Sequence, residues 1–300
     1  MRRAKSKPSE SAVHSAMTNP IRRVRSALFT PGTEAARLRK AVTSGADVCI
    51  FDLEDSVPAT RIGEAREIVR EALAELAGSA RIWLRVHPAA SPEMEEDLRT
   101  VSLSTLEAVV LPKASHRDDV QTCRRAMKQA DIGAELPVVP IIESAAGVLG
   151  CAAIAEATGV ACLALGRFDL AADLGIDPDG TSPVLAMARA SVVLASTAGR
   201  IDPPLDSPWL KIADLDGLRA AAERARTDGF GGMLIIHPSH VATVNEVFSL
   251  TADEIAWAQS IVASAAEADA AGRGAYARDG EMVDEAIVKR ARAVLRDAQP

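Results

Sequence analysis

Short apolar segments alternate with helical repeats along most of this chain, and the alternation limits the folds that it can adopt. The apolar segments end at Gly, Pro or polar residues, as strands buried on both faces of a parallel sheet do. Between them, apolar residues recur at every third or fourth position, which is typical of one helix face; Ile62, Ala65 and Val69 are an example. We predict strands at residues 26–29, 48–53, 82–86, 106–111, 138–142, 161–165, 200–206 and 233–236.

Eight strands alternating with helices favour a (β/α)8 TIM barrel over a doubly wound sheet, which usually has fewer strands and a glycine-rich phosphate turn. No G-x-G-x-x-G motif follows the first strand here. We assign residues 21–250 to a TIM-barrel catalytic domain. Residues 1–20 are polar and basic without apolar periodicity, so we expect a disordered leader. Residues 251–300 are predicted to form a C-terminal helical extension that packs on a neighbouring subunit.

The composition excludes several classes of protein. The 300 residues are 48% hydrophobic, which is enough for a sizeable core, and the net charge of -7 argues against a nucleic-acid partner. No apolar run approaches the roughly 18 to 20 residues that cross a bilayer, so we expect no membrane association. Four cysteines form no CxxC pair, and Cys49 and Cys162 fall in predicted buried strands. A reducing, cytoplasmic setting is therefore favoured.

Charged residues gather where the predicted strands end, which is where TIM barrels carry their active sites. Glu143 and Asp169 follow neighbouring parallel strands, whose ends lie at the same edge of a sheet, so the two carboxylates can meet. Two carboxylates with open coordination positions suit Mg²⁺, and they could equally cap the helices that follow. The other candidates are Asp52, Glu54, Asp55, Arg85, His87, Lys113, Asp202 or Asp206, and His237.

Each of these candidates has a structural alternative. Arg85 could simply pair with Asp52 or Glu54, and Lys113 could join those acids in an ion-pair network around the barrel mouth. His237, beside a proline, is better explained as a hydrogen-bonded structural histidine. A zinc site is not expected, since no His or Cys cluster has suitable spacing. In the functional interpretation, a 2-oxo or 2-hydroxy acid chelates the metal ion and an arginine holds developing enolate charge.

Nine motifs in collinear order then point to a family. They are LFTPG, GADVCIFDLEDSV, LRVH, VVLPK, PIIESAAGV, LALGRFDLAADLG, DLDGL, GFGGMLIIHPSHVATVNEVFS and DGEMVDEAIVKRA. Together they cover about Arg23 to Leu295 and closely resemble the HpcH/HpaI aldolase and citrate lyase β-subunit family, in its CitE-like branch. The resemblance implies a TIM barrel and a Mg²⁺-dependent lyase. Such an enzyme cleaves malyl-CoA or citramalyl-CoA type thioesters, which are 3-hydroxy-3-carboxyl acyl-CoA compounds, to an acyl-CoA and glyoxylate or pyruvate. It also implies a homotrimer or a multiple of one.

The resemblance assigns roles by position. The metal-binding acids of the family fall on Glu143 and Asp169, and Glu143 also lines the substrate site. Its substrate-binding and catalytic arginine falls on Arg85. Its C-terminal catalytic aspartate, which acts in a neighbouring subunit's site, falls on Asp284 and would move a proton to or from the acyl-CoA α-carbon. A supporting shell then comprises Asp52, Glu54, Asp55 and Lys113.

The chain departs from the family pattern at three places, one of which is the RIDPPLDSPW segment of the seventh predicted strand. His87 stands where the family usually has asparagine, and Arg167 and Phe168 stand where many relatives have small or acidic residues. Three other activities therefore stay open: a citrate lyase β subunit acting on an acyl-carrier-protein thioester, a malyl-CoA thioesterase, and a metal-dependent 4-hydroxy-2-oxo acid aldolase. The extension that carries Asp284 favours the CoA-dependent lyase.

Overall fold

The computed structural model describes residues 22–100, 106–131, 136–179, 181–270, 275–278 and 281–298. The predicted leader at residues 1–20 lies outside these ranges. The chain divides into two compact units, of which the first ends at Phe248 and the second begins at Ser249. Within the described ranges, no helix combines the length and the apolar character that crossing a membrane requires.

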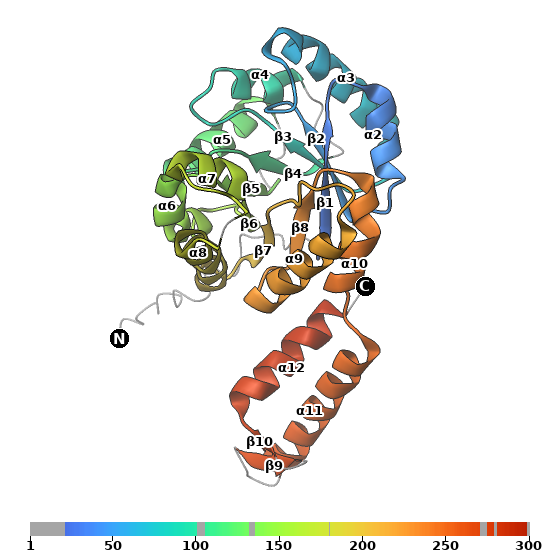
Figure 1. Cartoon of the computed structure of the whole chain (residues 1–300), viewed down its shortest axis with the longest axis vertical. Coiled ribbons are helices and arrows are strands. Elements are labelled where there is room, and N and C mark those ends of the chain that lie inside the picture. The colour runs from blue at the N-terminus through green and yellow to red at the C-terminus, as the bar shows by residue number, and fades with distance from the viewer. Residues whose placement is uncertain are drawn as a thin grey trace, which may run out of the picture. The chain divides into compact units, whose positions relative to one another are not determined.

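The first unit is the predicted TIM barrel. Over the described residues, eight parallel strands close into a barrel in sequence order, and the last strand pairs with the first (Figure 1). The strands are β1 (Ser26–Pro31), β2 (Val48–Asp52), β3 (Ile82–Arg85), β4 (Leu106–Leu111), β5 (Val138–Ile142), β6 (Cys162–Leu165), β7 (Asp202–Asp206) and β8 (Gly232–Ile235). The parallel order brings the carboxyl ends of all these strands to one mouth of the barrel.

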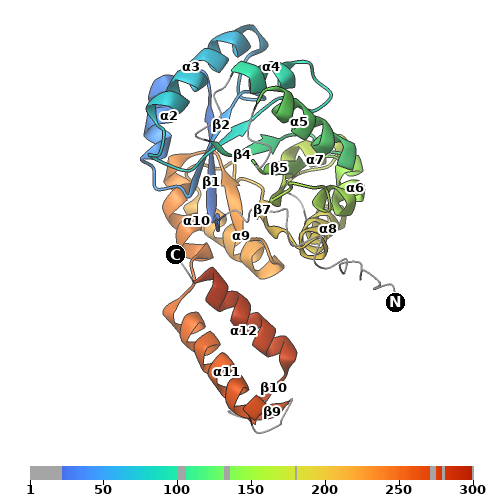
Figure 2. The same cartoon turned by 180° about the vertical axis from the view of Figure 1, so that it is seen from behind.

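Helices surround the strands, as the two opposite views in Figures 1 and 2 show. They are α2 (Ala35–Val42), α3 (Ile62–Glu75), α4 (Glu93–Thr100), α5 (Arg117–Gln129), α6 (Ala145–Ala155), α7 (Arg167–Leu174), α8 (Pro183–Gly199), α9 (Leu215–Asp228) and α10 (Val241–Phe248), with short 3₁₀ turns at Ala59–Arg61 and Pro238–His240. Side-chain caps begin several of them: Ser144 accepts from the backbone of α6, Ser182 from α8 and Asp214 from α9. These caps satisfy N–H groups that the helix itself leaves unbonded.

The core has two layers, because both faces of each strand are buried. In β2, Val48 and Ile50 fill the barrel interior, whereas Cys49 and Phe51 pack towards the helices. The side-chain period of two continues this alternation to the strand end and puts Asp52 on the interior face. By the same alternation, Arg85 lies on the interior face two residues after Trp83, and Glu143 lies there two residues after Ile141. The residues just beyond the interior core are thus charged and lie over the barrel mouth.

The second unit is a helical hairpin, which confirms the predicted C-terminal helices. Helix α11 (Ala252–Ala270) and helix α12 (Glu285–Asp297) lie side by side, with the antiparallel pair β9 (Tyr276–Arg278) and β10 (Glu281–Val283) at one end (Figures 1 and 2). Its own small core is formed by Ala258, Ile261, Ala265, Val283, Val288 and Ala291. Asp284 caps α12, because its carboxylate accepts hydrogen bonds from the backbone of Ala286 at 3.0 Å and Ile287 at 3.1 Å.

Candidate active site

Arg85, at the end of β3, is the centre of the polar cluster at the barrel mouth. Its Nε and Nη2 donate to the two oxygens of Asp52 at 2.6 and 2.7 Å, so the pair is bidentate. The guanidinium also lies 4.6 Å from the centre of the Phe29 ring, within cation–π range. Burial alone would lower the pKa of Arg85, but the contacts with Asp52 and the nearby acids raise it. Arg85 is therefore a fixed and fully charged cation.

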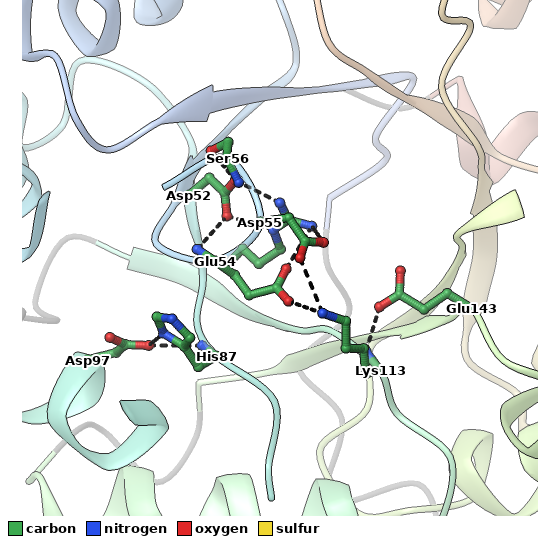
Figure 3. A network of polar contacts seen from close by, with 9 residues as sticks. Asp52, Glu54, Asp55, Ser56, His87, Asp97, Lys113 and Glu143 are labelled. Atoms are coloured by element: carbon green, nitrogen blue, oxygen red, sulfur yellow. Dashed lines mark hydrogen bonds and ion pairs between the residues drawn. The ribbon is translucent and has the colours of Figure 1, made fainter. Parts of the chain in front are cut away.

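Asp52 is itself held in one orientation. The side chain is 1% exposed, and its oxygens accept from the backbone N–H of Glu54 at 3.0 Å and of Ser56 at 3.3 Å, and from the Ser56 hydroxyl. These bonds turn the segment after β2 back over the strand end (Figure 3). Sequence reasoning missed Ser56, since a serine beside a proline-containing turn has no pattern that marks it as a partner of Asp52. The buried pair of Asp52 and Arg85 is thus oriented by the local chain.

Lys113 connects this cluster to Glu143. Its Nζ donates to Glu54 Oε1 at 2.5 Å and to Asp55 Oδ1 at 3.2 Å, and its backbone N–H donates to Glu143 Oε1 at 2.6 Å. The backbone of Lys113 has φ +54°, a left-handed conformation that costs energy for a residue with a side chain. One strained residue therefore ties the acids after β2 to the acid after β5 (Figure 3).

The two predicted metal-binding acids lie after neighbouring strands of the barrel, β5 and β6. Asp169 lies on the exposed first turn of α7, and its charge acts on Glu143, which is buried after β5. Neither acid is the N-cap of its helix: Ser144 caps α6, and Gly166 occupies the cap position of α7. Neither carboxylate is therefore held in place by serving as the N-cap of the helix that follows it.

The two acids fit a hard divalent cation. Burial, with a further contribution from Asp169, raises the pKa of Glu143 to about 8, against the hydrogen bond from Lys113. A cation bound between the two carboxylates would relieve both the burial cost and the repulsion. Over the described residues no group of three or more His, Cys, Asp or Glu forms a ligand cluster. Two carboxylates with the remaining positions left for water and substrate oxygens is the donor set that Mg²⁺ takes in proteins.

Three other candidates from the sequence have hydrogen-bond or ion-pair partners outside the network of Arg85 and Lys113. His87 Nδ1 lies 2.7 Å from an oxygen of the fully buried Asp97, which also accepts from Arg66 at 2.8 Å. Asp206 is paired with Arg189 of α8. His237 makes a local hydrogen bond to Ser239 at 2.7 Å, which agrees with its structural interpretation.

Two further residues that the family resemblance singles out have local partners of their own. Arg167 stacks on Phe168 at 4.7 Å and lies 3.8 Å from Asp179. Asp284 belongs to the second unit, where it caps α12.

Comparisons with known proteins identify the family of the chain. The sequence profile described as HpcH/HpaI aldolase/citrate lyase matches residues 25–238. A citrate lyase subunit beta-like protein from Deinococcus radiodurans is 32% identical over 284 residues, which cover 93% of this chain and 99% of the relative. The L-malyl-CoA/beta-methylmalyl-CoA lyase of Cereibacter sphaeroides is 33% identical, with coverage of 93% and 96%.

A solved structure is similar over almost the whole chain. The crystal structure of CitE from Mycobacterium tuberculosis, in complex with magnesium, acetoacetate and coenzyme A, superposes with a TM-score of 0.74 at 29% identity. The match covers 92% of this chain and 98% of that protein. The likeness therefore extends beyond the barrel into the C-terminal unit.

Proposed function

Because this chain belongs to the HpcH/HpaI aldolase/citrate lyase family, we propose that it is a Mg²⁺-dependent carbon–carbon lyase that cleaves a 3-hydroxy-3-carboxyl acyl-CoA thioester. The substrate is of the malyl-CoA or citramalyl-CoA type, and the products are an acyl-CoA and glyoxylate or pyruvate. The named lyase among its relatives and the CoA and magnesium of the similar crystal structure support this choice.

One observation carries the proposal: Lys113 contacts both Glu143 and Glu54, and Glu54 in turn lies beside Arg85. The side chain of Lys113 contacts Glu54 and its backbone contacts Glu143, while Glu54 lies 3.3 Å from Arg85 Nη1. A lyase of this kind needs an electrophilic site for the hydroxy acid beside a positive group for the enolate. The network keeps these two sites in a fixed relation.

Each residue of the site has a separate role in the proposed cleavage. Glu143 and Asp169 would hold Mg²⁺, which would supply Lewis-acid polarisation at the hydroxy-acid end of the substrate. Asp52 accepts from Nε and Nη2 of Arg85. We assign Nη1, which lies 3.3 Å from Glu54, to face the thioester oxygen as it becomes an enolate. Asp284 of a neighbouring chain in a homo-oligomer then delivers a proton to the α-carbon of that enolate.

The direct test is to incubate the full chain and Mg²⁺ with malyl-CoA, with citramalyl-CoA and with CoA-free 4-hydroxy-2-oxo acids, and to measure 2-oxo acid release. We expect release from one or both thioesters and none from the CoA-free substrates. Release from the CoA-free acids alone would show a metal-dependent aldolase instead. Activity only on a thioester of an acyl carrier protein would show a citrate lyase subunit.

A further inference from the structure

Two neighbouring acids, Glu54 and Asp55, form a carboxyl pair at the barrel mouth. Both side chains point at the ammonium of Lys113 (Figure 3), which lies 2.5 Å from Glu54 and 3.2 Å from Asp55. Arg85 Nη1 lies 3.3 Å from Glu54 Oε2 and 3.6 Å from Asp55 Oδ2. Glu54 Oε2 and Asp55 Oδ2 thus face the same guanidinium nitrogen. A hydrogen bond between the two carboxyl groups requires a proton on one of them, because an ionised carboxylate has no hydrogen to donate.

The two acids differ in their surroundings. The side chain of Glu54 is 4% exposed and that of Asp55 is 47% exposed. Lys113 donates to Glu54 Oε1, whereas Oε2 is buried and accepts no hydrogen bond within the described part of the chain. A buried carboxylate oxygen without a donor is costly. A proton on Oε2, donated to Asp55, would remove that cost.

The charge balance of the cluster points the same way. Asp52, Glu54 and Asp55 would bring three negative charges against the two positive charges of Arg85 and Lys113. One proton makes this cluster neutral. Glu143, after β5, adds negative charge nearby. His87, after β3, also lies within the field of Glu54, but it is paired with Asp97, whose negative charge offsets that of a protonated His87.

We propose that Glu54 and Asp55 share one proton in the resting site, and that Asp55 is the base that takes the hydroxyl proton of the substrate. The base role rests on the proposed function. Asp55 is the exposed member of the pair, and it lies beside Arg85 and one residue, Lys113, away from Glu143. Glu54 is a positioning residue: its proton keeps it neutral, so the negative charge of the pair resides on Asp55.

The proton and electron balance is complete with the groups already named. The substrate O–H bond breaks and its proton moves to Asp55, while the electron pair of that bond forms the carbonyl of the 2-oxo acid. The carbon–carbon bond breaks, and its electron pair leaves with the thioester as the enolate beside Arg85. Asp284, in its protonated form, protonates the enolate carbon and regains a proton from solvent. Asp55 afterwards returns its proton to solvent, to which it is open.

Infrared spectroscopy tests the shared proton without reference to turnover. With saturating Mg²⁺ at pH 7, we expect the wild-type spectrum to contain a protonated-carboxyl band that Glu54→Gln removes and Glu143→Gln leaves in place. A spectrum in which Glu54→Gln removes no such band overturns the shared proton. The Glu75→Gln variant, which alters an exposed pair with Arg39, is the control for a general effect of amide substitution.

Kinetics tests the base. We expect Asp55→Asn to lower kcat by about 10²-fold or more with KM little changed, and to abolish the acid-side fall of kcat with pH. Glu54→Gln should keep kcat within about tenfold of the wild type, because an amide imitates a neutral carboxyl group. The proposal is wrong if Asp55→Asn retains its activity, or if Glu54→Gln loses as much as Asp55→Asn does. A wild-type chain that cleaves no CoA thioester contradicts the proposed function and the base role together, and the infrared result still decides the shared proton.

Discussion

At the scale of single residues, Glu143 reaches its place because the residue beside it has no side chain. A Cβ on Gly166 would lie 2.5 Å from Glu143 Cβ and 2.6 Å from its Oε2. We expect Gly166→Ala to displace the carboxylate and to weaken Mg²⁺ binding by about 10- to 100-fold, the usual effect of disturbing the support of a metal ligand. Calorimetric titration of the purified chain with Mg²⁺ measures this change.

Gly63 provides the matched control for that substitution. It lies in the first turn of α3, and a Cβ there meets nothing within 4 Å. Gly63→Ala should therefore leave Mg²⁺ affinity unchanged, while the intrinsic preference of helices for alanine leaves the fold intact or slightly stabilised. Equal Mg²⁺ affinity in the Gly166→Ala and wild-type chains would contradict the placement of the metal at Glu143.

The charged residues of the site could be predicted from the sequence, but their pairing could not. Acids and bases at strand ends identify Asp52, Arg85 and Glu143, because the barrel brings all strand ends together. The choice of Asp52 as the bidentate partner of Arg85 depends on strand register, with Asp52 opposite Arg85 in the pairing of β2 and β3. The role of Asp97 is also hidden, since it lies in a charged helix, residues 93–100, where most acids face solvent.

At the scale of elements, His87 joins the end of β3 to the helix layer. Its ring bonds Asp97 of α4, and Arg66 of α3 bonds the other oxygen of Asp97. Burial lowers the pKa of His87, but the hydrogen bond and charge of Asp97 outweigh it and raise the pKa above the ordinary value. The stabilisation is thus complete below the unfolded pKa of about 6.5 and is lost as the pH rises through the folded pKa.

The raised pKa of His87 makes the free energy of unfolding depend on pH differently in the wild type and in a His87→Asn chain. We expect the free energy of unfolding of the wild type to fall, relative to that of His87→Asn, as the pH rises above about 6.5. Urea unfolding at a series of pH values measures it, and other titrating groups cancel because both chains contain them. A difference between the chains that stays constant from pH 6 to above the folded pKa would show that His87 gains no proton affinity from Asp97.

The eight strands could be predicted because a strand buried on both faces must be apolar. The weakest prediction, residues 200–206, forms the short strand β7 with the sequence DPPLD. Its two prolines cannot donate to a ladder. The strand still forms because the closed barrel supplies neighbours on both sides, with Leu205 opposite Ala164 of β6 and Gly232 of β8. The strand propensity of residues 202–206 alone does not predict this pairing, because the pairing depends on the two neighbouring strands of the barrel.

At the scale of the whole molecule, substitutions of Asp284 test whether the active site combines residues of two subunits. Asp284 caps α12 in its own chain, so alanine there would damage the helix, whereas asparagine caps about as well as aspartate. We expect Asp284→Asn to fold and to lose about 10²-fold or more in kcat. Mixed oligomers of inactive Asp284→Asn and Arg85→Ala chains should recover activity, because some sites then combine an intact Arg85 with an intact Asp284.

Activity of the mixture is compared with that of each variant alone at the same total concentration. No recovery in oligomers shown to contain both chains would contradict a role of Asp284 across a subunit boundary. Full activity of Asp284→Asn alone would show that this residue only caps the helix. Circular dichroism of each variant confirms that a loss of activity is not a loss of fold.

We propose that this barrel breaks a carbon–carbon bond of a CoA thioester at a Mg²⁺ site made by Glu143 and Asp169. The most direct measurement is simultaneous quantification of acyl-CoA, 2-oxo acid and free CoA after the wild-type and Asp169→Ala chains are incubated with citramalyl-CoA or malyl-CoA and Mg²⁺. We expect equal amounts of acyl-CoA and 2-oxo acid from the wild type, and neither from a folded Asp169→Ala chain. Free CoA with an intact hydroxy acid, as a thioesterase releases them, or undiminished cleavage by Asp169→Ala, would contradict this proposal.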